Sequence, residues 1–169
     1  MHIRQETPQD FDTVYRVVEE AFASALHSDG SEQDLVAALR KSAAFVPELS
    51  LVAERDGKII GYILFTEIRI GGCTALALAP LAVLPADQRQ GVGAALVREG
   101  HRIAAALGYP YAVVLGSERY YPRFGYVPAG QLGIRAPFEA PPENFMAIRL
   151  RPDAVPVQGV VQYAREFGI

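Results

Sequence analysis

An apolar strand runs into a glycine-bearing loop and then into a helix in the segment Leu81-Ala82-Val83-Leu84-Pro85-Ala86-Asp87-Gln88-Arg89-Gln90-Gly91-Val92-Gly93-Ala94-Ala95-Leu96. Gly91 and Gly93 carry no side chain, so a ligand can approach the backbone closely at this junction. The first N–H groups of a helix have no partner inside the helix, and the helix dipole places partial positive charge there. The segment therefore predicts a phosphate-binding site.

The strand before the loop, expected over 74–84, is almost continuously apolar, which is typical of a strand buried on both faces. Pro80 interrupts it and cannot donate a ladder hydrogen bond. We therefore expect a bulge at Pro80, or a place where the neighbouring strand has separated from this one. Either geometry leaves backbone groups free for a ligand.

The helix after the loop, expected over 92–107, has one apolar stripe and places His101 on its solvent side. Gly108 fits as its left-handed cap. A short strand is expected over 111–115, parallel to the strand before the helix because a crossover helix joins the two. Together these elements form one βαβ unit.

The N-terminal half predicts a strand, two helices and a hairpin. After a strand over 2–5, Thr7 and Pro8 begin a helix that ends near 27–30, and Ser31 caps a second helix in a segment closed by Pro47. Two β-rich runs, 51–55 and 58–70, are joined by Asp56-Gly57, which is typical of a tight hairpin turn.

The C-terminal third is less regular. A short helix or turn is expected over 116–124, an extended piece over 125–127 and a strand over 145–150 that pairs near Tyr126. The range 128–142 has little periodicity, and 160–167 fits a last helical turn or a strand.

Length and charge restrict the class of protein. The chain has 169 residues and is expected to form one domain over 1–169, and its net charge of −3 argues against general binding to nucleic acid or an anionic membrane. The longest apolar run, 75–86, is too short for a membrane span. Cys73 is the only cysteine and no secretory signal pattern opens the chain, so we expect a cytoplasmic location. The three histidines are scattered and predict no metal site.

Two common phosphate-binding loops do not fit the spacing around Gly91. A GxxxxGKS/T loop needs a lysine and a hydroxyl that are absent here. A dinucleotide-binding GxGxxG pattern needs a third glycine where Leu96 stands.

Gln88-Arg89-Gln90-Gly91-Val92-Gly93 instead resembles the Q/R-x-x-G-x-G/A pyrophosphate loop of the GNAT superfamily of acetyl-CoA-dependent N-acetyltransferases. The preceding 79–83 resembles that family's bulged fourth strand, and 121–126 resembles its Y-x-x-x-G-F/Y segment. The chain over 2–150 is most similar to the YhbS-like branch. The resemblance implies an α/β fold with a mixed, mostly antiparallel sheet that is splayed between two parallel strands, with helices on both faces.

The resemblance also implies where acetyl-CoA, the co-substrate, would bind. Backbone N–H groups of the loop would hold its pyrophosphate, main-chain groups of the bulged strand would pair with its pantetheine like an added strand, and two arginines would meet phosphate. One strand N–H would also polarise the thioester carbonyl. The predicted cofactor-binding residues are Leu81, Ala82, Val83, Gln88, Arg89, Gln90, Gly91, Val92, Gly93, Ala94 and Arg123.

Tyr121 is the expected general acid for the departing thiolate, because a phenol with a pKa of about 10 stays protonated at neutral pH. Tyr120 is expected to point elsewhere. Glu32, Glu67 and Glu118 are candidates for the base that takes the amine proton. The asparagine frequent in the family is replaced by Val114. The contacts that this asparagine would make to the acceptor or to pantetheine are therefore undefined.

The expected activity is acetyl transfer to a primary amine on a small molecule or a protein, without a metal. The acidic balance favours a cationic acceptor. The sequence does not decide whether the protein forms a homodimer or whether it transfers acyl groups other than acetyl. Two alternatives are a non-catalytic acyl-CoA sensor or interaction module, and a nucleotide-binding protein that uses the same loop.

Overall fold

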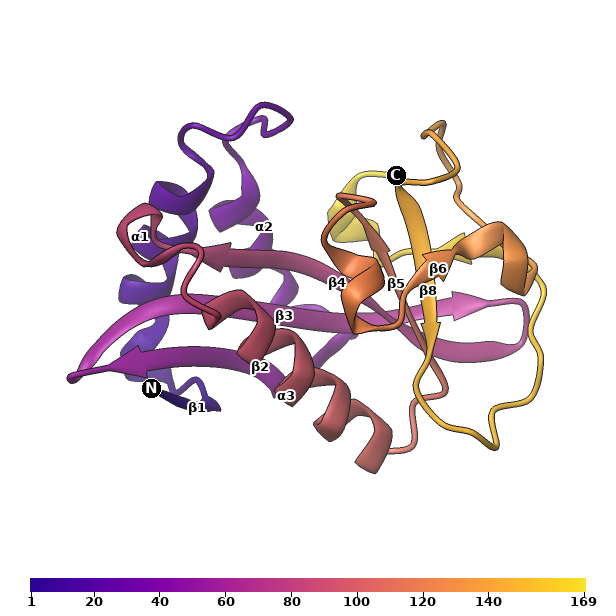
Figure 1. Ribbon diagram of the computed structural model, residues 1–169, viewed down its shortest axis with the longest axis horizontal. Helices are drawn as coiled ribbons and strands as arrows, with labels where there is room; N and C mark the ends of the chain where they lie inside the picture. The colour runs from indigo at the N-terminus through magenta and orange to yellow at the C-terminus, as the bar shows by residue number, and fades with distance from the viewer.

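The computed structural model describes residues 1–169 and is built around one central sheet (Figure 1). The strands are β1 (His2–Gln5), β2 (Phe45–Arg55), β3 (Lys58–Ile70), β4 (Cys73–Val83), β5 (Tyr111–Leu115), β6 (Val127–Pro128), β7 (Ile134–Arg135), β8 (Phe145–Arg149) and β9 (Gly159–Gln162). The α-helices are α1 (Phe11–Phe22), α2 (Glu32–Leu39) and α3 (Val92–Ala106). Short 3-10 turns are η1 (Pro8–Asp10), η2 (Pro85–Asp87), η3 (Tyr121–Phe124), η4 (Ala129–Leu132) and η5 (Arg165–Phe167).

The sheet is mixed and mostly antiparallel, as predicted. Its strand order is β1-β2-β3-β4-β5-β8-β6, and β9 joins β3 and β7 at one end. All neighbours are antiparallel except β4 with β5 and β7 with β9. The β2–β3 hairpin turns at Asp56 and Gly57, whose φ angles of 52° and 76° are the positive values that the dipeptide predicts.

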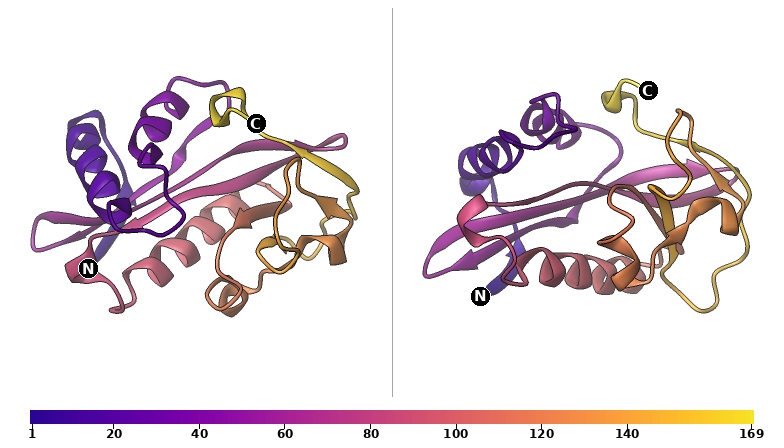
Figure 2. Two further views of the ribbon diagram at one scale, coloured as in Figure 1. Left: turned by 90° about the horizontal axis from the view of Figure 1, so that it is seen from above. Right: turned by 45° about the horizontal axis from the view of Figure 1, so that its top comes forward.

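Helices cover both faces of the sheet (Figure 2). α1 and α2 pack on one face and α3 on the other. Successive residues of β3 alternate between the two layers. Phe65 lies against α3, whereas the hydroxyl of Tyr62 belongs to a polar cluster under α1 and α2.

A buried polar cluster joins the N-terminal elements. Arg40, just after α2, donates two hydrogen bonds of 2.9 Å to Glu6, and the side chains of this pair are 11% and 3% exposed. Ser50 donates to Glu6 at 2.5 Å and shares a hydrogen bond of 2.7 Å with Tyr62. Burial raises the pKa of Tyr62. Because each charge meets its partner, the cluster ties β1, α2, β2 and β3 together without leaving an unpaired ion.

Two boundaries differ from the sequence prediction. β2 starts at Phe45 and includes Pro47, which lies where the β2–β3 ladder is interrupted between Phe45 and Ser50, so its missing N–H is not needed. α1 ends at Phe22 because the bond from Ala23 to the Glu20 carbonyl tightens its last turn. The strand β7 lies in the range expected to lack periodicity.

The C-terminal expectations are confirmed in outline. β6 pairs with β8 just after Tyr126. The range expected as a helical turn or a strand contains both, namely β9 and η5.

Gly100 sets how closely α3 approaches the sheet. A Cβ added there would lie 2.3 Å from Cε1 of Phe65, which is fully buried. We predict that Gly100→Ala lowers the free energy of unfolding by about 1–3 kcal/mol, because the crowded ring cannot move away. Denaturant unfolding measures this change. Gly130→Ala is the matched control, since its added Cβ meets nothing within 4 Å. A Gly100→Ala protein as stable as the wild type would contradict the prediction.

Candidate active site

The edge of β4 becomes free where β4 and β5 separate. Their pairing is confined to Leu76 with Ala112 and Ala77 with Val113. On the other side of β4, Ile63 pairs with Leu81 and Phe65 with Leu78, so Ala79 and Pro80 together oppose one residue of β3. This is the bulge that Pro80 predicts.

The free edge presents the backbone groups of Leu81 and Val83. Leu84 donates to the Ile60 carbonyl, toward β3, at 2.9 Å. Backbone groups alternate in direction along a strand, so Ala82 also faces β3, and Leu81 and Val83 face the opening. The Val83 carbonyl accepts a hydrogen bond of 3.1 Å from the Gln88 side chain.

The loop between β4 and α3 is a row of unpaired backbone donors. The N–H groups from Arg89 to Ala94 have no protein acceptor, and the first helical bond into this region runs from Ala95 to Gly91. Arg89 and Gly91 have φ angles of 62° and 86°, which turn the chain sharply. Successive free N–H groups at a helix N-terminus can bind anions, so the geometry is compatible with the phosphate site predicted for this segment.

A groove of about 550 Å³ lies along this loop and the free edge of β4. Arg123 and Tyr120 form part of its lining, and the Tyr120 hydroxyl lies against Gly93. The structure brings together most of the residues predicted for the cofactor, but Ala82 and Gln90 are not in the lining. Gln90 instead bonds Arg55 and the Ala86 carbonyl. The lining residues are Leu81, Val83, Asp87, Gln88, Arg89, Gly91, Val92, Gly93, Ala94, Tyr120 and Arg123.

Tyr121 opens η3 and lies behind Tyr120, outside the groove lining. Its ring packs edge-on against Tyr120 at 5.1 Å and Tyr126 at 5.6 Å between centroids, and a Cβ on Gly116 would come within 2.5 Å of it. Its hydroxyl has no hydrogen-bond partner and is not fully buried. Burial of the ring raises the pKa of Tyr121, so the phenol keeps its proton at neutral pH.

Tyr120 points away from the surroundings of Tyr121, as expected, but the sequence did not predict that it lines the groove. It lines the groove, and a Cβ added at Gly93 would lie 2.5 Å from its hydroxyl oxygen. The sequence carries little signal for this placement, because the two tyrosines are adjacent at the start of the same turn.

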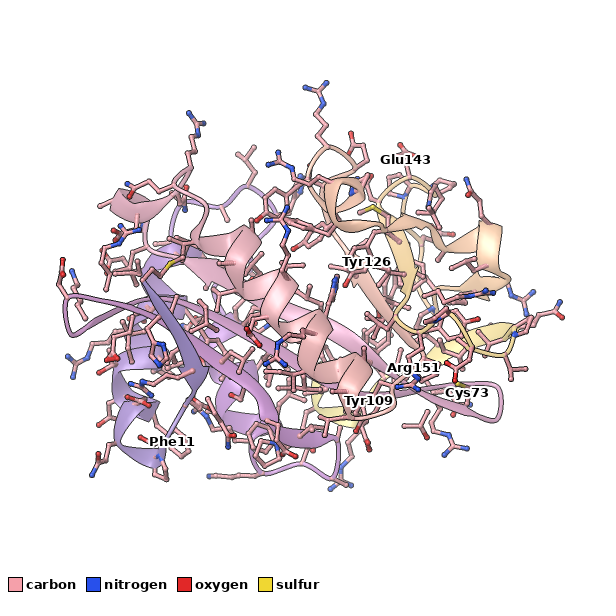
Figure 3. All side chains as sticks on the ribbon, turned by 60° about the horizontal axis from the view of Figure 1, so that its bottom comes forward. Phe11, Cys73, Tyr109, Tyr126, Glu143 and Arg151 are labelled. Carbon is pink, nitrogen blue, oxygen red and sulfur yellow. The ribbon has the colours of Figure 1, made fainter.

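His101 was expected on the solvent side of its helix, and the structure contradicts this. Its Nε2 and the hydroxyl of Tyr126 share a hydrogen bond of 2.9 Å, and its ring lies beside that of Phe65. Figure 3 shows Tyr126 between α3 and the C-terminal strands. Burial lowers the pKa of His101 to about 4, so the ring is neutral at pH 7.

None of the three candidate bases lines the groove. Glu32 accepts a hydrogen bond of 2.7 Å from Ser28. Glu67 accepts one from Tyr109, which follows the C-terminal end of α3 (Figure 3), far from the glycine loop. Glu118 accepts a 2.7 Å bond from Asn144, and bonds from its own backbone N–H and from Asn144 lower its pKa.

The residues present fit a coenzyme with a pyrophosphate and a strand-like arm. The unpaired N–H groups would receive the pyrophosphate, and the free edge of β4 would receive an amide chain. No group of three or more His, Cys, Asp or Glu side chains is arranged to hold a metal ion. None of the helices has the length and apolar character needed to cross a membrane.

The fold and this groove define an acyl-coenzyme A-dependent transferase. A sequence model of the acetyltransferase (GNAT) family matches residues 12–126. The chain therefore belongs to the GNAT family of acetyl-CoA-dependent N-acetyltransferases.

Several relatives support this assignment. The chain is 33% identical over 171 residues to the uncharacterized N-acetyltransferase YhbS of Escherichia coli, covering 99% of this chain and 98% of the relative. It is 42% identical over 118 residues to the uncharacterized N-acetyltransferase YjhQ of the same organism, covering 67% of this chain and 65% of the relative.

Solved structures agree with the sequence relatives. A Brucella melitensis GNAT family acetyltransferase in complex with acetyl-CoA is 38% identical, with a TM-score of 0.81 over 98% of this chain and 97% of the other. The E. coli YhbS structure in complex with CoA is 32% identical, with a TM-score of 0.90 over 99% and 92%.

The neutral His101 predicts a pH dependence of stability. Its folded pKa of about 4 lies below its ordinary value of 6.5, so the unfolded chain binds more protons between these values. The part of the unfolding free energy that depends on neutral His101 is fully present above about pH 6.5 and is lost as the pH falls toward 4. We predict that between pH 7 and pH 5 the wild type loses about 2 kcal/mol more unfolding free energy than His101→Gln.

Urea unfolding at the two pH values measures this difference. Both proteins have the same carboxylates, so the pH dependence that these groups cause cancels when the two losses are subtracted. Equal losses in the two proteins would show that His101 is not held neutral.

Proposed function

We propose that residues 1–169 act as one N-acetyltransferase domain that moves an acetyl group from acetyl-CoA to a primary amine by direct attack. The observation that carries this proposal is the row of unpaired N–H groups from Arg89 to Ala94, which continues the free edge of β4. The protein has two hydrophobic clusters, one that includes Phe65 and Leu78 and one that includes Ile68 and Ala75. The long strands β3 and β4 contribute to both clusters, which supports a single domain.

The cofactor contacts divide between the loop and the strand. The loop N–H groups bind pyrophosphate, and Arg89 and Arg123 supply positive charge. The outward backbone groups of Leu81 and Val83 pair with pantetheine amides as an added strand would. The Val83 carbonyl already accepts one hydrogen bond from the Gln88 side chain, and a pantetheine amide would use its second lone pair or replace Gln88. A strand N–H then polarises the thioester carbonyl as negative charge develops on its oxygen.

Acetyl-CoA supplies an acetyl group as a thioester, from which a neutral amine displaces the thiolate. Tyr121 donates its phenolic proton to the sulfur and recovers a proton from solvent. Its hydroxyl is free for this role because no protein group binds it. The raised pKa keeps the donor protonated through the neutral range.

We assign removal of the amine proton to water. The three candidate glutamates are each held by another side chain, and none lines the groove. A cationic acceptor fits the net charge of −3, which attracts ammonium groups from solution.

Calorimetry with acetyl-CoA, followed by thiol release with a panel of amines, tests the proposal. Binding below millimolar concentration and release of CoA with at least one amine are expected. A folded protein that fails to bind would overturn the proposal. Binding without transfer would favour the acyl-CoA sensor, and preference for ATP or NAD would favour a nucleotide site.

We predict that Tyr121→Phe lowers kcat about 100-fold, because loss of a positioned acid typically costs 10²-fold or more. The Kd for acetyl-CoA should stay within about twofold, since the ring packing is kept. Steady-state kinetics and calorimetry measure the two effects. Tyr163→Phe is the matched control, because its hydroxyl has no protein partner and its ring, which packs on Phe138 and Phe167, lies against a different hydrophobic cluster from Tyr121. An unchanged kcat in Tyr121→Phe would remove its assigned role.

We also predict that Glu32→Gln, Glu67→Gln and Glu118→Gln each change kcat by less than about tenfold, because none of them takes the amine proton. Steady-state rates at saturating amine between pH 6 and pH 9 measure this. A loss of about 100-fold in one variant, with the rate rising at high pH, would identify that glutamate as the base.

A further inference from the structure

Tyr120 has the surroundings of a ligand-binding residue rather than of a packing residue. Its ring is half-buried between Tyr121 and Phe124, with centroid distances of 5.1 Å to each. Its hydroxyl, however, reaches the groove and has no hydrogen-bond partner in the protein. A phenol that is held by its ring and left free at its polar tip is positioned to donate to a ligand.

The hydroxyl lies beside the backbone of Gly93. Its oxygen would be 2.5 Å from a Cβ at that position, so the absent side chain is what gives it room. The Gly93 N–H is one of the unpaired donors at the start of α3. The phenol and this N–H therefore lie side by side at the start of α3, on the lining of the same groove.

Two arginines make that space electropositive. The guanidinium of Arg123 lies 4.9 Å from the centre of the Tyr120 ring, and that of Arg98 lies 5.2 Å from the ring of Phe124. Burial raises the pKa of Tyr120 and both arginines oppose the rise, but the net direction is upward. The phenol is thus a neutral donor next to two cations, which suits an anionic oxygen.

We propose that Tyr120 is a cofactor-binding residue whose hydroxyl donates to a pyrophosphate oxygen of coenzyme A, beside the Gly93 N–H. The two adjacent tyrosines then have separate tasks: Tyr120 holds the cofactor and Tyr121 moves the proton. This inference rests on the proposed function, and it adds a phosphate contact outside the glycine loop.

Calorimetric titration of the free enzyme with CoA tests the proposal in the wild type, Tyr120→Phe and Tyr121→Phe. Loss of a hydrogen bond to a charged group should weaken CoA binding about 10-fold or more in Tyr120→Phe. Tyr121→Phe should stay within about twofold. The thermal unfolding midpoint of each variant shows that the ring packing is retained.

A second titration uses 3′-dephospho-CoA, which keeps the pyrophosphate and lacks the 3′-phosphate. The loss in Tyr120→Phe should be the same for this probe. A loss that disappears with 3′-dephospho-CoA would place Tyr120 on the 3′-phosphate and overturn the assigned contact. Wild type that binds CoA while Tyr120→Phe binds it equally well would overturn the inference alone. Wild type that binds no CoA would overturn the proposed function.

Discussion

The structure depends on the early separation of two parallel strands in the middle of its sheet. After Ala77 and Val113 the ladder between β4 and β5 stops, and the bulge at Pro80 carries β4 onward with its outer edge unpaired. Backbone groups of a sheet need partners, and an open edge is a template for another extended chain. The glycine loop follows directly at the end of this edge, so one continuous backbone path offers strand pairing first and anion binding next.

The parts of this path that come from local chemistry could be predicted from the sequence. Gly91 adopts a positive φ at the start of α3, Pro80 lies at the predicted bulge, and Asp56-Gly57 forms the predicted hairpin turn. The start of β2 at Phe45 could not be predicted, because Pro47 is tolerated only through an interruption in the ladder with β3. His101 was misplaced for a related reason: the C-terminal strands bring Tyr126 against a helix face that its own sequence marks as polar.

The adjacent tyrosines at the start of η3 show a further limit of sequence reasoning. Tyr120 precedes the turn and Tyr121 is its first residue, and the two side chains face different surroundings. Tyr120 reaches Gly93 and Tyr121 packs against Gly116 and Tyr126. A family pattern identifies the second tyrosine, whereas the first is recognised only from its contact with Gly93 in the structure.

The contact between Gly100 and Phe65 has a consequence for the loop as well as for packing. Gly100 lies seven residues after Gly93, which is about 10 Å along a helix. α3 therefore packs on the Phe65 ring at Gly100 and presents the row of free N–H groups at its N-terminal end. We expect a change of ring volume at Phe65 to shift the N-terminal end of α3, so that a substitution in the hydrophobic core moves the free N–H groups without touching any residue of the groove.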